Sequence, residues 1–347
     1  MSSSKLSEET RKLQFTGGCT YIISLPKRWI EENQLNRGSS IRLRIEEDGL
    51  LSIIPNNKAV QENPNEAILK IVSKENPQVI IRKTISTYLI GFNVIRIRPE
   101  KQKLLTTNQR QEIKRFSRTM LVGTEIVRDT AQELTLQVLL SYPELSIQNA
   151  LRRMSIIAAS MHKYAMSALK KLDYQLANEV KNTDNEVDRF NLYVVRQLKT
   201  AILNPRIIKE IGLDNARDCL GYRLVIKSVE RTADHSAKIA DNVLSLKHNL
   251  DAELFTKLEL MSNLAISMFE TSIEALFRQD YALAEGIVEK IDEVITIEKE
   301  AVALTQKTSS EELANLRLII ESIRRTAEYG SDIAEVVLNL TIKSILS

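Results

Sequence analysis

An internal repeat limits what this chain can fold into. Residues 230–240 read ERTADHSAKIA and residues 325–334 read RTAEYGSDIA. Upstream, DYQLA at 173–177 matches DYALA at 280–284. Both copies lie in stretches with apolar residues at helical spacing, which is the pattern of amphipathic helices. A repeat on this scale indicates that residues 146–347 form two similar helical bundles.

The helical pattern divides this part of the chain into six segments. Pro205 and Gly212 interrupt it between the second and the third. We therefore predict two three-helix bundles joined end to end, over residues 146–248 and 251–347. The six predicted helices are 146–172, 174–203, 214–248, 251–279, 281–306 and 309–346.

The front of the chain is mixed, since six of the seven prolines precede residue 144. In residues 10–56, two strands meet at Gly17-Gly18, Pro26 opens a helix that ends at Gly38, and a hairpin turns at Asp48-Gly49. So small a set of elements cannot bury a core alone. Residues 56–64 are polar and have the composition of a linker.

Residues 66–142 predict a small α/β unit. Thr107 is the expected cap of its second helix. The unit carries no recognised chemical motif, which favours a spacer or a dimer contact. Its predicted strands are 68–72, 93–98, 125–129 and 133–140, and its predicted helices are 76–92 and 107–120. The whole chain is therefore expected to be α+β and mainly α.

Composition narrows the class of protein. No apolar run approaches the ~18 residues of a membrane span, and the N-terminus lacks the apolar core of a signal peptide. The cysteines, Cys19 and Cys219, fall in different predicted domains, so no disulfide framework is expected. We expect a cytoplasmic protein. The net charge is +2 over residues 1–58, +4 over 59–145 and −3 over 146–347, compatible with a polyanion at one end and a cation at the other.

Two pairs of carboxylates are the strongest candidates for chemistry. Asp184 and Asp188 form one i, i+4 pair, and Glu230 and Asp234 form the other. Neighbouring carboxylates on one helix face repel, so that face is either solvated or holds a cation. An oxygen-rich patch of this kind suits Mg²⁺, Mn²⁺ or iron. The alternative is a solvated acidic face neutralised by basic neighbours such as Arg231.

The second copy of the repeat departs from this pattern. Ile291 and Ile295 stand where the first acidic pair would be, and Arg324 replaces Glu230. Glu328 and Asp332 form a different i, i+4 pair, which makes a weaker metal candidate.

Other catalytic arrangements are not evident. The sequence has no Walker motif and no glycine-rich dinucleotide loop. His235 follows Asp234 but points about 100° away on a helix, so we do not expect it on the carboxylate face. His162 and His248 have no ligand-like neighbours. We therefore expect a protein that is not an enzyme.

The repeated motifs resemble the PhoU family of phosphate-signalling regulators. The resemblance rests on Asp-x-x-x-Asp at 184–188 and on Glu-Arg-x-Ala-Asp-His-x-x-x-Ile-Ala at 230–240, and it covers residues 146–347. It implies metal binding through the acidic motifs. It also implies control of phosphate transport by contact with the transporter ATPase or its signalling partners.

The segment QFTGGCTYIISLPK at 14–27 resembles the SpoVT/AbrB type of swapped-hairpin DNA-binding module. That resemblance implies a homodimer in which two copies interleave, and DNA as a partner. The combination with a PhoU-like region is similar to archaeal PhoU-like regulators. The candidate phosphate contacts are Arg11, Lys12, Lys27, Arg28, Arg37, Arg42 and Arg44. A solvated basic strand on a module that only dimerises is the alternative.

These features predict a cytoplasmic, dimeric, DNA-binding regulator of phosphate uptake with a metal-binding helical module. The alternative is a metal-dependent phosphohydrolase or a metal-storage protein built on the carboxylate patch, and the sequence offers no clear general base beside that patch.

Overall fold

The computed structural model of the protein describes residues 9–18, 20–45, 49–55, 66–72, 74–100, 103–139, 146–307 and 310–346. The chain divides into two compact units, residues 1–63 and 64–347. The three predicted domains that begin at residues 66, 146 and 251 all fall within the second unit. Cys19, Asp48 and the predicted linker lie outside the described residues.

The first unit, here called the head, holds two separate antiparallel hairpins and one short helix. Gly17 and Gly18 have φ of +62° and +78°, which lets the first hairpin turn tightly. Most of the large apolar side chains of the two hairpins remain exposed, with Phe15 at 60% and Ile45 at 80%. Its elements are β1 (Gln14–Thr16), β2 (Thr20–Ile22), α1 (Lys27–Glu32), β3 (Ile41–Ile45) and β4 (Leu51–Pro55).

Helix α1 is shorter than predicted, because it ends at Glu32 and not near Gly38. Gln34 adopts a left-handed conformation with φ of 52°. The backbone N–H of Leu35 then donates to the carbonyl of Ile30, which closes the end of the helix.

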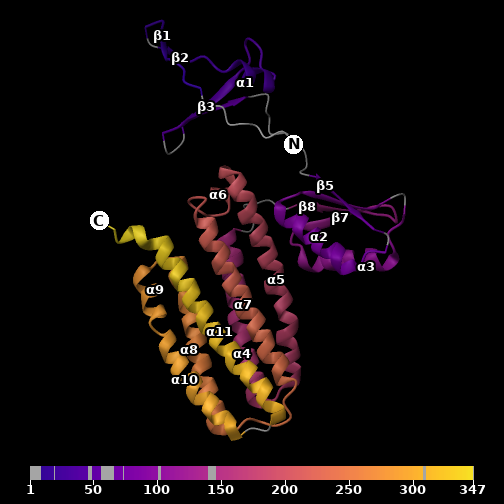
Figure 1. Cartoon of the computed structure of the whole chain (residues 1–347), viewed down its shortest axis with the longest axis vertical. Coiled ribbons are helices and arrows are strands. Elements are labelled where there is room, and N and C mark those ends of the chain that lie inside the picture. The colour runs from indigo at the N-terminus through magenta and orange to yellow at the C-terminus, as the bar shows by residue number, and fades with distance from the viewer. Residues whose placement is uncertain are drawn as a thin grey trace. The chain divides into compact units, whose positions relative to one another are not determined.

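The predicted α/β unit is present. Its sheet has the order β5-β6-β8-β7, with β5 and β6 parallel and the other neighbours antiparallel. Helices α2 and α3 cover one face and bury a small core with it (Figure 1). The elements are β5 (Glu66–Ile71), α2 (Pro77–Ile90), β6 (Val94–Pro99), α3 (Thr107–Met120), β7 (Thr124–Asp129) and β8 (Leu134–Val138).

The cap of α3 is Thr106, so the prediction of Thr107 is wrong by one residue. The Thr106 hydroxyl accepts from the N–H of Gln109 at 3.2 Å, and the Gln109 side chain accepts from the N–H of Thr106 at 3.0 Å. This reciprocal pair is a capping box, which satisfies two backbone donors at once.

The rest of the second unit is helical. Asp173 and Asp280 accept from the N–H of Leu176 and Leu283, each at 3.0 Å, so the repeated DYxLA segments are helix N-caps. The elements are α4 (Ile147–Lys171), α5 (Tyr174–Leu203), α6 (Pro205–Glu210), α7 (Asp218–Val243), α8 (Ala252–Arg278), α9 (Tyr281–Val288), α10 (Ile291–Leu304), η1 (Thr305–Lys307), α11 (Ser310–Thr341) and η2 (Ile342–Ser344). The chain is mainly helical with strands at the front, which confirms the predicted fold class.

The two bundles lie side by side and not end to end (Figure 1). Helices α7 and α11 pack against each other, as do α4 and α8, and one continuous core runs through both bundles. Gly330 of α11 permits the close crossing with α8, since a Cβ there would lie 2.9 Å from the backbone nitrogen of Phe269.

A buried arginine joins the α/β unit to the bundle. Arg196 of α5 is only 3% exposed. Its guanidinium donates to the carbonyls of Gly91 and Phe92, each at 3.0 Å, to the Asn93 side chain at 2.8 Å, and to the carbonyl of Tyr88. These acceptors surround the C-terminus of α2, where the helix dipole favours a positive charge. Helices α2 and α3 thus rest on α5.

In the part of the chain that the structure describes, no helix combines the length and the apolar character that crossing a membrane requires.

Candidate functional site

Three of the predicted carboxylates converge between helices α5 and α7. Asp188, Glu230 and Asp234 each offer one oxygen, and these oxygens lie within 4.8 Å of one another. Among the described residues this is the one such group of three or more acidic, histidine or cysteine side chains. Asp184, one turn before Asp188, lies outside this group.

Burial raises the pKa of the three aspartates at this place, Asp184, Asp188 and Asp234. The pKa of Asp184 rises to about 7, chiefly through burial and then through the charges of Asp188, Asp234 and Glu230. The pKa of Asp188 rises to about 6, again through burial first and then through the two carboxylates of α7. Burial followed by the charge of Glu230 also raises the pKa of Asp234. Concentrated negative charge therefore works against folding at this place.

Two polar oxygens at the cluster have no hydrogen-bond partner among the described residues. They are Oδ1 of Asp184 and Oδ1 of Asn191, and both are buried. Asn191 lies three residues after Asp188 and therefore on the same face of α5. Sequence reasoning missed it, although the i, i+4, i+7 spacing of Asp184, Asp188 and Asn191 is a readable signal. Carboxylate and amide oxygens are ligands that hard divalent cations accept.

Lys227 forms an ion pair with Glu230 of the three-carboxylate group, and among the described residues it is the one basic side chain paired with a member of that group. Arg231 and Lys238 of α7 are exposed. They lower the pKa of Asp234 only in part, because its net shift is still upward. The residues present therefore fit a divalent cation, with Asp188, Glu230 and Asp234 as ligands and with the unpartnered oxygens of Asp184 and Asn191 on the same face of α5.

The matching region of the second copy is neutralised by the protein itself. Arg324, at the position equivalent to Glu230, lies 3.2 Å from Glu298 and forms an ion pair with Glu328. Arg325 also donates to Glu328 at 3.0 Å. Burial and the neighbouring carboxylates raise the pKa of Asp332. Among the described residues, Glu328 and Asp332 do not join a three-residue cluster.

The histidines lie away from the carboxylate cluster. His235 is buried, and its Nδ1 lies 3.2 Å from the Ser322 hydroxyl of α11. His162 is buried among α4, α8 and α11, 2.8 Å from the Ser262 hydroxyl, and burial lowers its pKa to about 4. His248 is exposed, 3.6 Å from Glu312.

All seven basic candidates of the head are exposed. Lys27 and Arg28 of α1 each pair with a glutamate one turn later, at 3.6 Å and 2.7 Å. Arg11 pairs with Glu9. On β3, Arg42 and Arg44 share one face and the apolar residues share the other. Lys12 and Arg37 complete the set.

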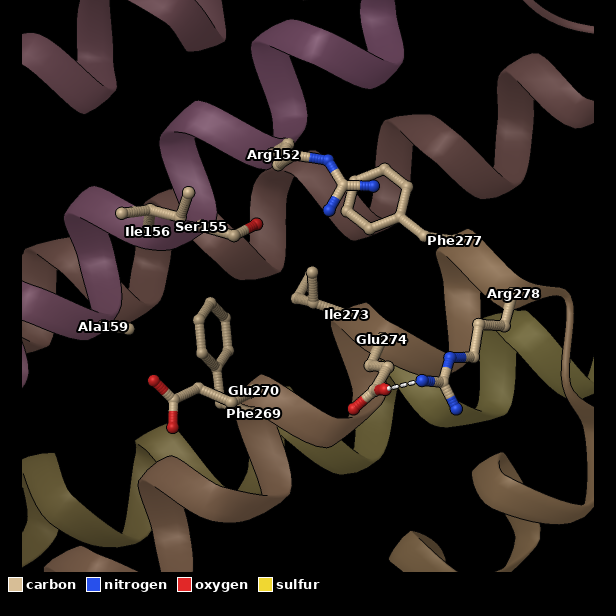
Figure 2. A pocket seen from close by; sticks show the side chains of 10 residues that line it. All are labelled: Arg152, Ser155, Ile156, Ala159, Phe269, Glu270, Ile273, Glu274, Phe277 and Arg278. Carbon is tan, nitrogen blue, oxygen red and sulfur yellow. Dashed lines mark ion pairs between the residues drawn. The ribbon is translucent and has the colours of Figure 1, made fainter.

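A pocket of about 510 Å³ opens between α4 and α8 (Figure 2). Arg152 stacks 4.2 Å over the ring of Phe277, and Arg278 pairs with Glu274 at 2.6 Å. None of the predicted site residues lines this pocket.

Comparison with known proteins agrees with the architecture. The PhoU domain family matches residues 151–243 and 258–337. The family described as "Antidote-toxin recognition MazE, bacterial antitoxin" matches residues 14–61.

Two PhoU homologues are similar in sequence. The phosphate-specific transport system accessory protein PhoU homolog of Aquifex aeolicus is 26% identical over 132 residues, which is 38% of this chain and 57% of that protein. The protein of the same description from Borreliella burgdorferi is 26% identical over 184 residues, which is 50% of this chain and 81% of that protein. The chain thus spans little more than half the length of the first of these relatives.

The crystal structure of PhoU from Pseudomonas aeruginosa is similar in fold. It has a TM-score of 0.50 and 18% identity, covering 57% of this chain and 96% of that one. The doubled family match coincides with the two bundles, and the second match coincides with the hairpin head. The chain is therefore a PhoU-domain protein with an N-terminal module of the MazE/AbrB type.

Proposed function

We propose that this protein regulates phosphate uptake, with a helical module that binds a divalent metal ion and a dimeric head that contacts DNA. The observation that carries the proposal is the pairing of the two modules in one chain, a doubled PhoU domain behind a MazE/AbrB-type head. The PhoU homologues are named as accessory proteins of phosphate-specific transport systems. Contact with a transporter ATPase or a signalling protein is part of this proposal.

The metal part rests on the carboxylate cluster of α5 and α7. A divalent cation such as Mg²⁺, Mn²⁺ or Fe²⁺ would offset the charge of Asp188, Glu230 and Asp234. It would thereby hold the two helices together across the cluster. This is the role that the chain's own residues support, since the charges would otherwise repel.

Titration of each ion in turn, with the melting temperature as readout, tests the metal part. A ligand at 100 times its Kd should stabilise the protein by about 2.7 kcal/mol. Asp188→Asn with Asp234→Asn should abolish the shift, whereas Glu328→Gln with Asp332→Asn, the matched pair in the second copy, should retain it. If none of the three ions changes the melting temperature of the parent protein, the metal proposal fails and these acids form a solvated face.

Genome-wide DNA occupancy tests the regulatory part. The parent protein should occupy sites beside phosphate-transport genes, and occupancy should differ between phosphate-replete and phosphate-starved cells. Lys27→Ala with Arg28→Ala should reduce occupancy at all sites, because phosphate contacts carry little sequence information. Occupancy that is equal to background in both conditions would refute DNA binding in the cell.

A further inference from the structure

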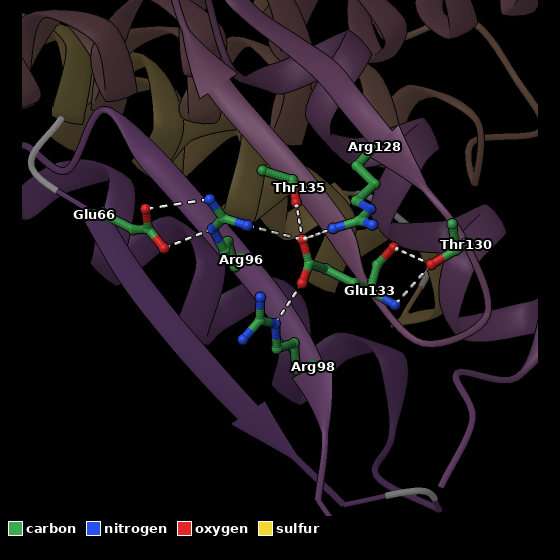
Figure 3. A network of polar contacts seen from close by, with 7 residues as sticks. All are labelled: Glu66, Arg96, Arg98, Arg128, Thr130, Glu133 and Thr135. Carbon is green, nitrogen blue, oxygen red and sulfur yellow. Dashed lines mark hydrogen bonds and ion pairs between the residues drawn. The ribbon is translucent and has the colours of Figure 1, made fainter. Parts of the chain in front are cut away.

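The face of the α/β sheet opposite α2 and α3 carries a cluster of arginines that contact a shared partner, Glu133. At its centre Glu133 is 5% exposed and accepts hydrogen bonds from three of them (Figure 3). Arg96 and Arg128 donate to it at 3.3 Å and 3.4 Å, and Arg98 also pairs with it. The Thr135 hydroxyl donates to the same carboxylate at 2.8 Å.

The strand register arranges this face in rows. One row runs from Ile68 through Arg96 and Thr135 to Arg128. Beside it, Lys70 is opposite Arg98, whose guanidinium reaches Glu133. These two rows hold four basic side chains and one carboxylate, and Arg96 also pairs with Glu66 of the next row at 2.5 Å. The remaining row is acidic at both ends, with Glu66 and Glu125 on the two edge strands.

Glu133 orients the three arginines, but its single negative charge does not neutralise their combined positive charge. Burial alone would raise the pKa of Glu133, but bonds from Thr135 and Arg98 and the charges of Arg98 and Arg128 lower it to about 2. The carboxylate is therefore ionised and shared among three guanidiniums. Side chains of Arg98 and Arg128 remain 42% and 58% exposed, so part of each planar donor group faces solvent. Such groups suit phosphate oxygens.

The whole α/β unit is basic. Residues 66–139 contain 13 lysines and arginines against 7 acidic residues, a net charge of +6, which is more than the +3 of the entire chain. An excess of this size raises the local concentration of polyanions.

We propose that this open sheet face binds the sugar–phosphate backbone of duplex DNA. The basic rows cross four strands, so from Lys70 to Arg128 they span on the order of 14 Å. That length fits several phosphates of a duplex, which carries one charge per ~1.7 Å of its axis, better than it fits one isolated phosphate.

Two other occupants fit less well. The rows contain no aromatic side chain on which the bases of a single strand could stack. A second copy of the same face would bring two clusters of arginines together. Such an interface is disfavoured, because the centres of homodimer interfaces are poor in charged residues. The proposal concerns a different domain from the head and does not depend on DNA binding by the head.

Binding of the full chain to a labelled duplex of arbitrary sequence, over a series of KCl concentrations, tests the proposal. Lys70→Ala with Arg128→Ala removes two charges and leaves Arg96 and Arg98 on Glu133. It should weaken binding roughly tenfold at low salt and reduce the salt slope by about 2. Arg223→Ala with Lys299→Ala, which removes two exposed charges from the bundle, should change neither quantity.

A second variant works in the opposite direction. Glu125→Gln removes an exposed acid from the same face and should tighten binding, so the test does not rely on loss of function alone. An unchanged salt slope in Lys70→Ala with Arg128→Ala, or no gain from Glu125→Gln, would overturn the proposal.

Head variants separate the two DNA contacts. If Lys27→Ala with Arg28→Ala removes all binding while the sheet variant matches the parent, the sheet proposal fails and the head contact stands. If only the sheet variant loses affinity, the sheet contact stands and the head contact fails. Displacement of the duplex by inorganic phosphate, at an ionic strength matched with KCl, would identify a site for single phosphates and would also overturn the proposal.

Discussion

At the scale of single residues, the carboxylates of α5 and α7 are stabilised by being protonated, coordinated or paired. The folded pKa values of Asp184 and Asp188, about 7 and about 6, both exceed the ordinary value of 3.8. Between pH 3.8 and pH 7 the folded state therefore binds more protons than the unfolded state. By linkage, stability falls as pH rises through that window.

The first prediction is a melting temperature that decreases from pH 5 to pH 8 in buffer with a chelator, and levels off above the pKa of about 7. The free-energy change should be on the order of 2 kcal/mol. Asp184→Asn with Asp188→Asn should flatten the profile and raise the melting temperature at pH 8. Glu285→Gln with Glu289→Gln, an exposed i, i+4 pair on and just after α9, serves as the control and should leave the slope unchanged. Calorimetry over this range would contradict the argument if the double Asn variant kept the parent slope.

The sequence indicated individual residues where periodicity gave the signal. Asp188, Glu230 and Asp234 meet because two i, i+4 pairs lie on neighbouring helices. The arginines around Glu133 were missed, because those contacts depend on strand register across distant segments. Asn191 was missed although its spacing from Asp184 and Asp188 is readable, because the sequence does not show that its amide oxygen is buried without a partner. Spacing along one element shows a face but not what lies opposite it.

At the scale of elements, the prediction gave the right type for each helix and strand that it named, missed α6, and failed at several ends. Helix α3 ends at the predicted Met120 but begins one residue earlier than a cap at Thr107 predicts, because its cap is Thr106. The predicted helix 281–306 is two helices, α9 and α10, and the short α6 begins at the Pro205 that was expected only to interrupt. The side-by-side packing of the bundles could not be predicted, because the repeat fixes each bundle but not their contact.

Three glycines test how tightly the helices cross. Gly330→Ala should destabilise the protein by about 1–3 kcal/mol, since its Cβ would meet the backbone of α8 at 2.9 Å. Gly221→Ala should cost less, because the nearest atoms, at 3.1 Å, belong to side chains that can shift. Gly286→Ala has open space in α9 and should stabilise by up to about 1 kcal/mol. Urea unfolding of the three variants gives the order, and a Gly330→Ala protein as stable as its parent would contradict the close crossing.

Arg196 tests the joint between the α/β unit and the bundle. Arg196→Met removes the donors to the end of α2 and leaves buried acceptors unpaired, at a cost of about 1–3 kcal/mol for each group that water cannot reach. Limited proteolysis should then cut the α/β unit faster, while the bundle resists. Arg152→Met, which removes an arginine stacked on Phe277 at the pocket between α4 and α8, is the matched control. Equal cleavage rates in parent and Arg196→Met would show that the joint does not depend on this residue.

At the scale of the whole molecule, the head differs from the second unit in how it buries apolar surface. The two described cores lie entirely within residues 64–347. In the head, Leu43 and Ile45 of β3 are 61% and 80% exposed, on the face opposite Arg42 and Arg44. Contiguous exposed apolar surface of this kind marks an interaction site. We propose a second copy of the head as the partner, because a unit with so few elements cannot bury a core alone.

The last prediction is that this apolar face carries the dimer. Deleting residues 1–63 should leave a folded helical protein, since the deletion removes no residue of either core, and should weaken self-association in sedimentation. In the full chain, Leu43→Ser with Ile45→Ser should have the same effect, because it removes apolar area without touching a charge. Arg42→Ser with Arg44→Ser changes the other face of the same strand and should leave the dimer intact while weakening DNA binding. If Leu43→Ser with Ile45→Ser leaves the sedimentation coefficient unchanged, the head does not hold the two chains together, and DNA contacts doubled by dimerisation lose their basis.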